Sequence, residues 1–171
     1  MSEAVKIRQL VRADVQALEE LHKTGCTLKW SVRLKDGSEN KFATKGLDGT
    51  ATDKDEGIRF YGMFVDDVLV SAAAVGFQYS KDESAELGRP NGFIRTIYTH
   101  PDYRRKGYGR EMMRIAEDAV VRFGDYASSV VLEKKSMDER SMRIAQCFLS
   151  ACGYTYEQTV EDHDCFGKQL I

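Results

Sequence analysis

A short basic segment that contains two glycines, residues 104–110, has the residue types and spacing of a site for a phosphate group. It reads Arg-Arg-Lys-Gly-Tyr-Gly-Arg, so that four cations surround Gly107 and Gly109. A glycine lets the backbone come close to a ligand because it has no Cβ. The helical pattern that follows would direct its first amides, and the positive end of its dipole, at an anion. We therefore predict that this segment binds a phosphate or a pyrophosphate.

Two familiar phosphate-binding patterns are absent here. The pattern GxxxxGK followed by Ser or Thr does not occur, and the dinucleotide pattern GxGxxG fails because its third glycine would be Met112. A solvated basic face at the start of a helix is the simpler alternative for so short a motif. The segment follows a run of β-branched and aromatic residues, 93–99, that is typical of a central strand. This position favours the anion site.

The chain around this segment alternates between strand and helix patterns. Strands are predicted over 5–10, 60–65, 68–75, 93–99, 127–132, 154–160 and 165–171. Apolar residues at helical spacing predict helices that begin at Asp14 and Ser136. A third helix follows the basic segment directly, has apolar positions from Met112 to Phe123, and ends near Gly124. The order β-α-insertion-β-β-β-α-β-α-β-β predicts an α/β fold with a mixed sheet.

Local patterns refine this prediction. Asp66-Asp67 has the length of a two-residue turn and joins the second and third strands into a hairpin. Ser136 and Glu139 have the spacing of a capping box. The helix that this box opens would turn inward the side chains of Ile144, Ala145, Phe148 and Leu149. The cysteines on or near this helix, Cys147 and Cys152, are expected to be small core residues.

The composition limits the class of protein. The 171 residues suit one globular domain, and 25 Lys and Arg against 27 Asp and Glu argue against nucleic acid as the main partner. The longest stretch without a charge, Val68 to Ser80, is too short for a membrane span, and the first residues lack a targeting pattern. The four cysteines form no CxxC pair. We expect a cytoplasmic protein with reduced thiols and no membrane partner.

The motif also resembles a known family. Arg104-x-x-Gly107-x-Gly109, after a strand that ends in His-Pro-x-Tyr, resembles motif A of the GNAT superfamily of acyl-CoA-dependent N-acetyltransferases. The similarity covers nearly the whole chain except residues 25–57 and 80–91. It includes four further features: Ile7-Arg8, Asp14-x-x-x-Leu18, the Asp66-Asp67 hairpin, and Ala145-x-x-Phe148 followed by Gly153-Tyr154.

This resemblance implies a GNAT-like single domain over residues 1–171, with an insertion at about 25–57. Its sheet would be mixed and mostly antiparallel, with a splayed centre flanked by helices, and acetyl-CoA would lie between the fourth and fifth strands as the acyl donor. Backbone groups of Ile97, Tyr98 and Thr99 would bond the pantetheine arm, and an amide near Tyr98 or Thr99 would polarise the thioester. The pyrophosphate would be held by Arg104, Arg105, Lys106, Gly107, Tyr108, Gly109 and Arg110.

The usual catalytic residues of the family are missing. Many members carry in the last helix a Tyr that protonates the leaving thiolate, and here that position is Leu149, with Met142 at the position of the accompanying Asn. Some members use a Glu near the start of the fourth strand as a base, and here that position is Phe93. The identity of the catalytic residues is therefore unknown. Tyr154 and Tyr156 are the nearest candidates by sequence.

The resemblance implies an N-acetyltransferase that moves an acetyl group from acetyl-CoA to a primary amine of a small molecule, a peptide or a protein. The alternative is a non-catalytic acyl-CoA-binding sensor or interaction module. We expect no metal, because nothing in the sequence brings His22-x-x-x-Cys26 and His163-x-Cys165 together. Trp30 and Phe42 either anchor the insertion or line the amine pocket. The amine, the length of the acyl group, and the choice between a monomer and a homodimer stay open.

Overall fold

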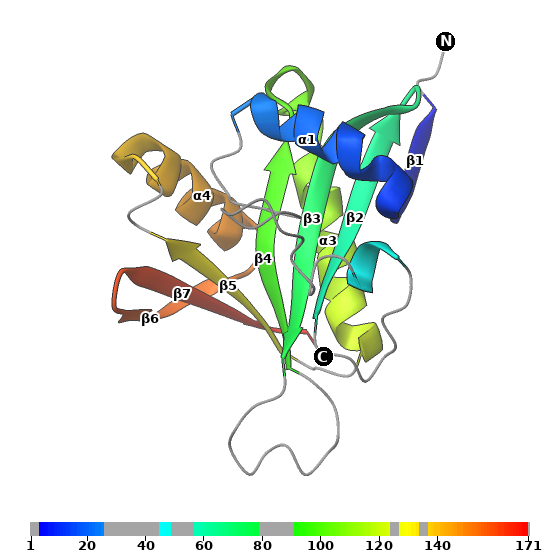
Figure 1. The fold of residues 1–171 in the computed structure, drawn as a ribbon. Helices are drawn as coiled ribbons and strands as arrows, with labels where there is room; N and C mark the ends of the chain where they lie inside the picture. The colour runs from blue at the N-terminus through cyan, green and yellow to red at the C-terminus, as the bar shows by residue number, and fades with distance from the viewer. Residues whose placement is uncertain are drawn as a thin grey trace, which may run out of the picture.

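The computed structural model describes residues 4–25, 45–48, 57–78, 91–123, 127–133 and 137–170. Seven strands form one sheet in the order β1-β2-β3-β4-β5-β7-β6. The strands are β1 (Val5–Gln9), β2 (Gly57–Val65), β3 (Val68–Gln78), β4 (Asn91–Thr99), β5 (Ala127–Glu133), β6 (Thr155–Val160) and β7 (His163–Gln169). The principal helices are α1 (Val15–Lys23), α3 (Tyr108–Phe123) and α4 (Glu139–Ala151). The predicted α/β fold and element order are confirmed (Figure 1).

The sheet is mixed and mostly antiparallel, as predicted. Among the described strands, only β4 and β5 pair in parallel, and they pair at two positions, Phe93 with Ser129 and Ile94 with Val130. Beyond Ile94 the two strands spread apart toward their carboxyl ends (Figure 1). The centre of the sheet is therefore splayed. Most of the predicted insertion, with Trp30 and Phe42, lies outside the described residues.

The predicted hairpin of β2 and β3 is confirmed. Asp66 and Asp67 form its two-residue turn with φ angles of 48° and 65°, and Val65 pairs with Val68. Left-handed backbone at both turn residues matches the twist of the two strands, and Asp tolerates this conformation better than most residues. The turn thus needs no glycine.

Each face of the sheet has its own core, because side chains of β3 alternate between the two faces. Ala73 and Val75 pack on the side of α3, while Ala72 and Ala74 pack on the side of α1. Figure 1 shows α1 in front of the sheet and α3 behind it. The small residues of β3 leave room for a helix on both faces.

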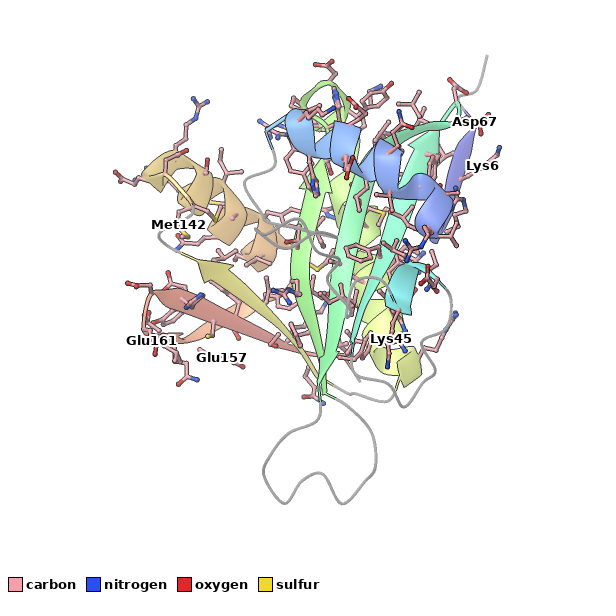
Figure 2. The ribbon with its side chains drawn as sticks, in the orientation of Figure 1. Lys6, Lys45, Asp67, Met142, Glu157 and Glu161 are labelled. Carbon is pink, nitrogen blue, oxygen red and sulfur yellow. The ribbon has the colours of Figure 1, made fainter. Side chains whose placement is uncertain are left out.

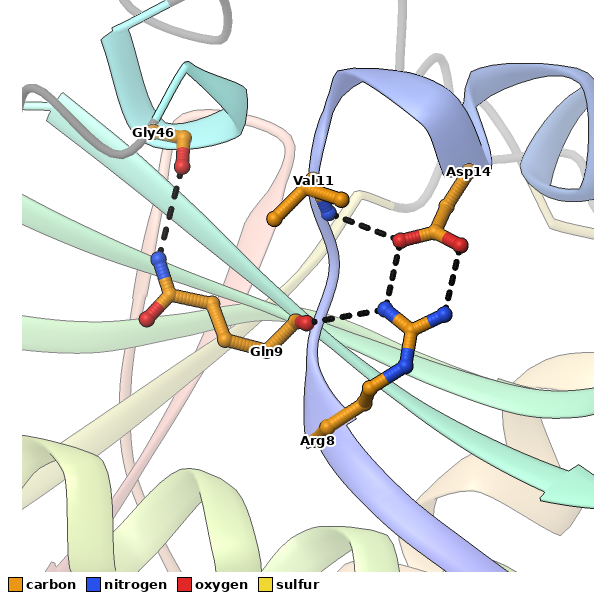
Figure 3. A network of polar contacts seen from close by, with 5 residues as sticks. All are labelled: Arg8, Gln9, Val11, Asp14 and Gly46. Atoms are coloured by element: carbon orange, nitrogen blue, oxygen red, sulfur yellow. Dashed lines mark hydrogen bonds and ion pairs between the residues drawn. The ribbon is translucent and has the colours of Figure 1, made fainter.

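A polar network fixes the entry into α1 (Figure 3). The guanidinium of Arg8 on β1 donates to both carboxylate oxygens of Asp14, at 2.6 and 2.7 Å, and the amide of Val11 donates to the same carboxylate at 2.8 Å. Gln9 Nε2 donates to Gly46 O at 3.4 Å, which connects β1 to residues 45–47. The predicted start of this helix at Asp14 is correct to within one residue.

The predicted start of α4 is wrong. The helix begins at Glu139, and its N-cap is Asp138, whose carboxylate accepts a hydrogen bond from Ser141 N at 2.8 Å. Glu139 is thus the first helical residue rather than the third, and Ser136 lies outside the described residues. Asp caps a helix as well as Ser does, and here Asp138 is the residue that caps it.

The inward face of α4 also differs from the prediction. Leu149 is 2% exposed and Ala145 and Phe148 are half-buried, as expected, but Ile144 is 61% exposed. Cys147, predicted in the core, is exposed, whereas Cys152 is half-buried. In the parts of the chain that the structure describes, no helix is long and apolar enough to cross a membrane.

Candidate functional site

The basic segment lies in a tight connection between β4 and α3. After Thr99, a 3-10 turn at Pro101–Tyr103 reverses the chain, and His100 Nδ1 accepts a hydrogen bond from Asp102 N at 3.2 Å. Arg104 N then donates to Pro101 O at 3.2 Å. These bonds hold the connection in one shape, so α3 starts beside the carboxyl end of β4.

The start of α3 is open toward an incoming anion. Gly107 has a φ of 87°, which favours glycine, and its carbonyl accepts the first helical bond, from Glu111 N at 3.1 Å. This bond is the first of the helix, so the amides of residues 108–110 precede the helical hydrogen-bond ladder. The helix dipole adds positive potential at the same point. The geometry agrees with a phosphate-binding helix start.

The four cations of the segment play different parts. Arg104 turns back, with Nε donating to Thr99 O at 3.1 Å and the guanidinium 5.6 Å from the centre of the Tyr98 ring. Lys106 Nζ lies 5.1 Å from the centre of the Tyr103 ring. The side chains of Arg105 and Arg110 are exposed, and no hydrogen bond or ion pair joins either of them to another described residue. Arg104 therefore braces the turn, and Arg105 and Arg110 are the cations most available to a ligand.

The register of β4 decides which of its backbone groups a ligand can reach. His100 N donates to Val70 O at 2.8 Å, and bonding to one neighbour alternates along an antiparallel pair. Tyr98 therefore bonds to β3, while the N–H and C=O of Ile97 and Thr99 point toward the side of β5. Beyond Ile94, β5 provides no pairing there. Of the three residues predicted to contact a ligand through the backbone, Ile97 and Thr99 have that orientation and Tyr98 does not.

An irregularity in β4 lies where it leaves β5. Val75 pairs with Ile94 and Ala74 with Thr96, so Arg95 is an extra residue in β4, and its carbonyl accepts from Thr96 Oγ1 at 2.7 Å. Such a bulge bends the strand and redirects its groups. Nothing in the sequence indicated it, because residues 93–99 continue a normal strand pattern.

Thr99 and Phe148 lie beside Gly109 at the start of α3. A Cβ on Gly109 would lie 3.5 Å from both Thr99 Oγ1 and Phe148 Cε2. The carboxyl end of β4, the start of α3 and the last turns of α4 thus meet at one point. Met142, at the position of the family's Asn, lies nearer the start of α4 (Figure 2).

Phe93 and Leu149, at the positions of the missing catalytic residues, also have apolar surroundings. The ring of Phe93 lies so close over Gly76 that a side chain there would overlap it. Leu149 is in the core on the α3 side of the sheet. Neither position supplies a group that could take or give a proton.

The two tyrosine candidates have different surroundings. Tyr154 precedes β6, is 3% exposed in the core, and its amide donates to Leu149 O at 3.0 Å. Tyr156 is 56% exposed, and its hydroxyl lies 2.8 Å from Thr159 Oγ1. Its strand, β6, is separated from β4 by β5 and β7. Glu157 and Glu161 mark this outer edge in Figure 2, across the molecule from Lys6 of β1. Of the two tyrosines, only Tyr154 therefore lies where it could act as the general acid.

Burial shifts the pKa values of Cys152 and His22. Burial raises the pKa of the Cys152 thiol, and nearby Glu117 raises it further, so the thiol is protonated at neutral pH. Burial lowers the pKa of His22 on α1, against the opposing effect of Glu19.

Within the described ranges, no group of three or more His, Cys, Asp or Glu could hold a metal ion, and Cys26 lies outside those ranges.

Comparison with known proteins agrees with this geometry. Residues 15–147 match the model of the acetyltransferase (GNAT) family. The fold is similar to that of PaiA N-acetyltransferase from Thermoplasma acidophilum in complex with coenzyme A, at 16% identity, with 97% of this chain and 99% of that chain covered and a TM-score of 0.64. It is also similar to the aminoglycoside N-acetyltransferase AAC(6')-Iy in complex with CoA, at 16% identity, with 94% of each chain covered and a TM-score of 0.68. No curated relative matches the sequence.

Proposed function

The chain belongs to the acetyltransferase (GNAT) family, and from this we propose that it moves an acetyl group from acetyl-CoA to a primary amine of a small molecule or a protein. Family membership favours an enzyme, an acyltransferase, over the binding module without turnover that the sequence left open. Both share the acyl-CoA site, so the distinction between them rests on catalysis.

One observation supports this site best: the unpaired edge of β4 lies next to the anion-binding start of α3. The backbone groups of Ile97 and Thr99 point to the side that β5 leaves unpaired, and α3 starts just beyond them. In the proposed complex, this edge bonds the pantetheine arm. The amides of residues 105–110 hold the pyrophosphate, with Arg105 and Arg110 as nearby cations. Positioning of this kind lowers the barrier to acyl transfer.

The reaction requires one bond to form and one to break. The neutral amine nitrogen attacks the thioester carbon, the C–S bond breaks, the thiolate gains a proton, and the amine loses one. An amide on the open edge of β4, at Ile97 or Thr99, would polarise the thioester carbonyl. An alkylamine has a pKa of about 10, so its proton must leave before attack. With Phe93 and Leu149 at the usual positions, we infer that ordered water carries these protons and that no single side chain is essential.

The proposed acceptor is a small-molecule amine. Among the similar structures, the aminoglycoside acetyltransferase AAC(6')-Iy is in complex with CoA and, in another structure, with a bisubstrate analogue of CoA and acetylneamine. This supports a small-molecule amine for the present chain. We further propose one catalytic domain, without a metal, located in the cytoplasm, where the free thiols of Cys147, Cys152 and Cys165 would stay reduced. A homodimer is compatible with this proposal.

Release of CoA thiol tests the function directly. Purified protein with acetyl-CoA is offered polyamines, aminoglycosides, amino acids and peptides, and the free thiol is followed with a chromogenic reagent. We expect release that depends on one class of amine and rises with pH as free amine appears. Tight CoA binding with no thiol release for any amine would favour the binding module. No binding of CoA would contradict the proposed function altogether.

A further inference from the structure

A buried hydroxyl lies directly behind the proposed binding edge. Ser71 of β3 is 0% exposed, and its Oγ lies 2.9 Å from Tyr98 O and 2.9 Å from Thr99 Oγ1. Thr99 itself is half-buried, and its Oγ1 faces the Gly109 side of α3. The two hydroxyls therefore form a short chain from the interior of the sheet to the point where β4, α3 and α4 meet.

The number of protons fixes the direction of this chain. A serine hydroxyl has one proton to donate, and a carbonyl can only accept. Ser71 donates to Tyr98 O, so the bond between the two hydroxyls must be donated by Thr99. The Thr99 hydroxyl then donates its proton to Ser71 Oγ, and the lone pairs of Thr99 Oγ1 can accept a hydrogen bond from a ligand. Because Ser71 is buried, no water competes for this arrangement.

We propose that Ser71 is a positioning residue that holds the Thr99 hydroxyl as a hydrogen-bond acceptor for a donor group of the ligand. The inference rests on the proposed function, in which that ligand is CoA. The pantetheine arm carries two amide N–H groups and a hydroxyl, whereas an ionised pyrophosphate has no proton to donate. Thr99 thus recognises the pantetheine arm through its side chain and contributes nothing to binding of the phosphates.

Ligand fragments separate these two contributions. Calorimetry would compare CoA with adenosine 3′,5′-bisphosphate, which has the nucleotide and a 5′-phosphate but no pantetheine. We expect Thr99→Val, which keeps the shape and removes the hydroxyl, to weaken CoA binding roughly three- to tenfold, the effect of one hydrogen bond, and to leave binding of the bisphosphate unchanged. The matched control is Thr96→Val, because the hydroxyl of Thr96 bonds the carbonyl of its own neighbour, Arg95.

A second variant tests the role of Ser71. In a Ser71→Ala background the Thr99 hydroxyl is free to turn, so the further loss from Thr99→Val should be smaller than in the wild-type chain. Equal losses in both backgrounds would overturn the positioning role. Weaker binding of the bisphosphate by Thr99→Val would show that Thr99 donates to phosphate, and an unchanged CoA affinity would show no contact; either overturns the proposal. Failure of the wild-type chain to bind CoA would instead contradict the function on which it rests.

Discussion

Gly109 and Phe148 face each other across the start of α3 and the end of α4, so that a Cβ on Gly109 would lie 3.5 Å from Phe148 Cε2. This is an ordinary van der Waals distance, so Gly109→Ala should fit the fold and lose only part of its affinity for CoA, because its small Cβ faces the ligand. Gly109→Glu places a longer, negatively charged side chain at the proposed pyrophosphate site. We expect its CoA affinity to collapse while thermal unfolding stays close to that of Gly109→Ala. Calorimetry that finds equal affinities for the two variants would contradict the assignment of this helix start.

The exposed cations should give CoA binding a salt dependence. Charges at the surface are screened beyond about 8 Å at physiological ionic strength, so the affinity should fall as salt rises. We expect the double variant Arg105→Gln with Arg110→Gln to bind CoA more weakly and with a smaller salt dependence.

The control for this pair is Arg114→Gln. Arg114 is on the same helix, but its guanidinium already pairs with Glu111 at 2.8 Å and Asp118 at 2.6 Å. Its removal should leave the salt dependence of binding unchanged. Affinity that is independent of salt in the wild type would show that amides alone hold the phosphates.

The ion pair of Arg8 with Asp14 should stabilise the fold at neutral pH and not in acid. The hydrogen bonds from Arg8 hold the pKa of Asp14 below its usual value. Its stabilising effect is therefore full above the pKa of the unfolded chain, about 3.9, and is lost as the pH falls through the lower folded value. We expect Asp14→Asn to reduce the free energy of unfolding by roughly 1.5–3 kcal/mol at pH 7, as for hydrogen bonds to charged groups, with a smaller loss near pH 3.

Asp67→Asn is the matched control for that measurement. Asp67 pairs with Lys6 at 2.8 Å, but both side chains are exposed, and such surface pairs contribute little. Urea unfolding at both pH values should therefore separate the two variants clearly. An equal effect of Asp14→Asn and Asp67→Asn would contradict the structural role of the Arg8–Asp14 pair.

His22 should make the protein less stable in mild acid. Burial lowers the pKa of His22 in the folded chain. Between the unfolded value, about 6.5, and that lower folded value, the unfolded chain binds the extra proton, so stability falls as the pH is lowered. We expect His22→Gln to flatten the dependence of the unfolding free energy on pH below about 6.5. If chemical unfolding at several pH values showed the same pH dependence of the unfolding free energy in the variant, other groups would be responsible for it.

The absence of one essential acid can be tested with a pair of tyrosines. Tyr156 is on the outermost strand, so Tyr156→Phe should leave thiol release at the wild-type rate. Tyr154 is in the core beside Leu149, and Tyr154→Phe should slow turnover by less than about tenfold, because loss of a true general acid costs roughly 10²–10⁴-fold. A loss of that size for Tyr154→Phe with CoA affinity intact would identify Tyr154 as the acid.

Local patterns in the sequence predicted most elements of the fold because the relevant contacts are local. The Asp66-Asp67 turn and the basic start of α3 depend on residues within a few positions of each other, and both are found where they were expected. The start of α4 shows the limit of this approach. Asp138 and Ser136 are both good capping residues, and sequence spacing alone favoured the wrong one.

The finer geometry of the site depends on pairing between distant strands. The backbone groups of Tyr98 and Thr99 point to opposite sides, as in any strand, and only the register with β3 decides which of them faces β5. Likewise, Arg104 looks like a phosphate ligand in the sequence, but its Nε donates to Thr99 O. The extra residue at Arg95 also follows from register alone. None of these contacts leaves a signal within a short window of sequence.

The two-position pairing of β4 with β5 divides the sheet into two parts, β1 to β4 and β5 to β7, that share few backbone hydrogen bonds. β5 pairs with β7 along its whole length, from Ala127 to Glu133, whereas only Phe93 and Ile94 connect it to β4. An ion pair between Lys168 on β7 and Glu117 on α3, at 2.9 Å, and a shared hydrophobic core also join the two parts. A ligand bound along the open edge of β4, between β4 and β5, would therefore add contacts between the two parts of the sheet. Its binding free energy would add directly to their cohesion, so substrate occupancy and resistance to local unfolding would rise together.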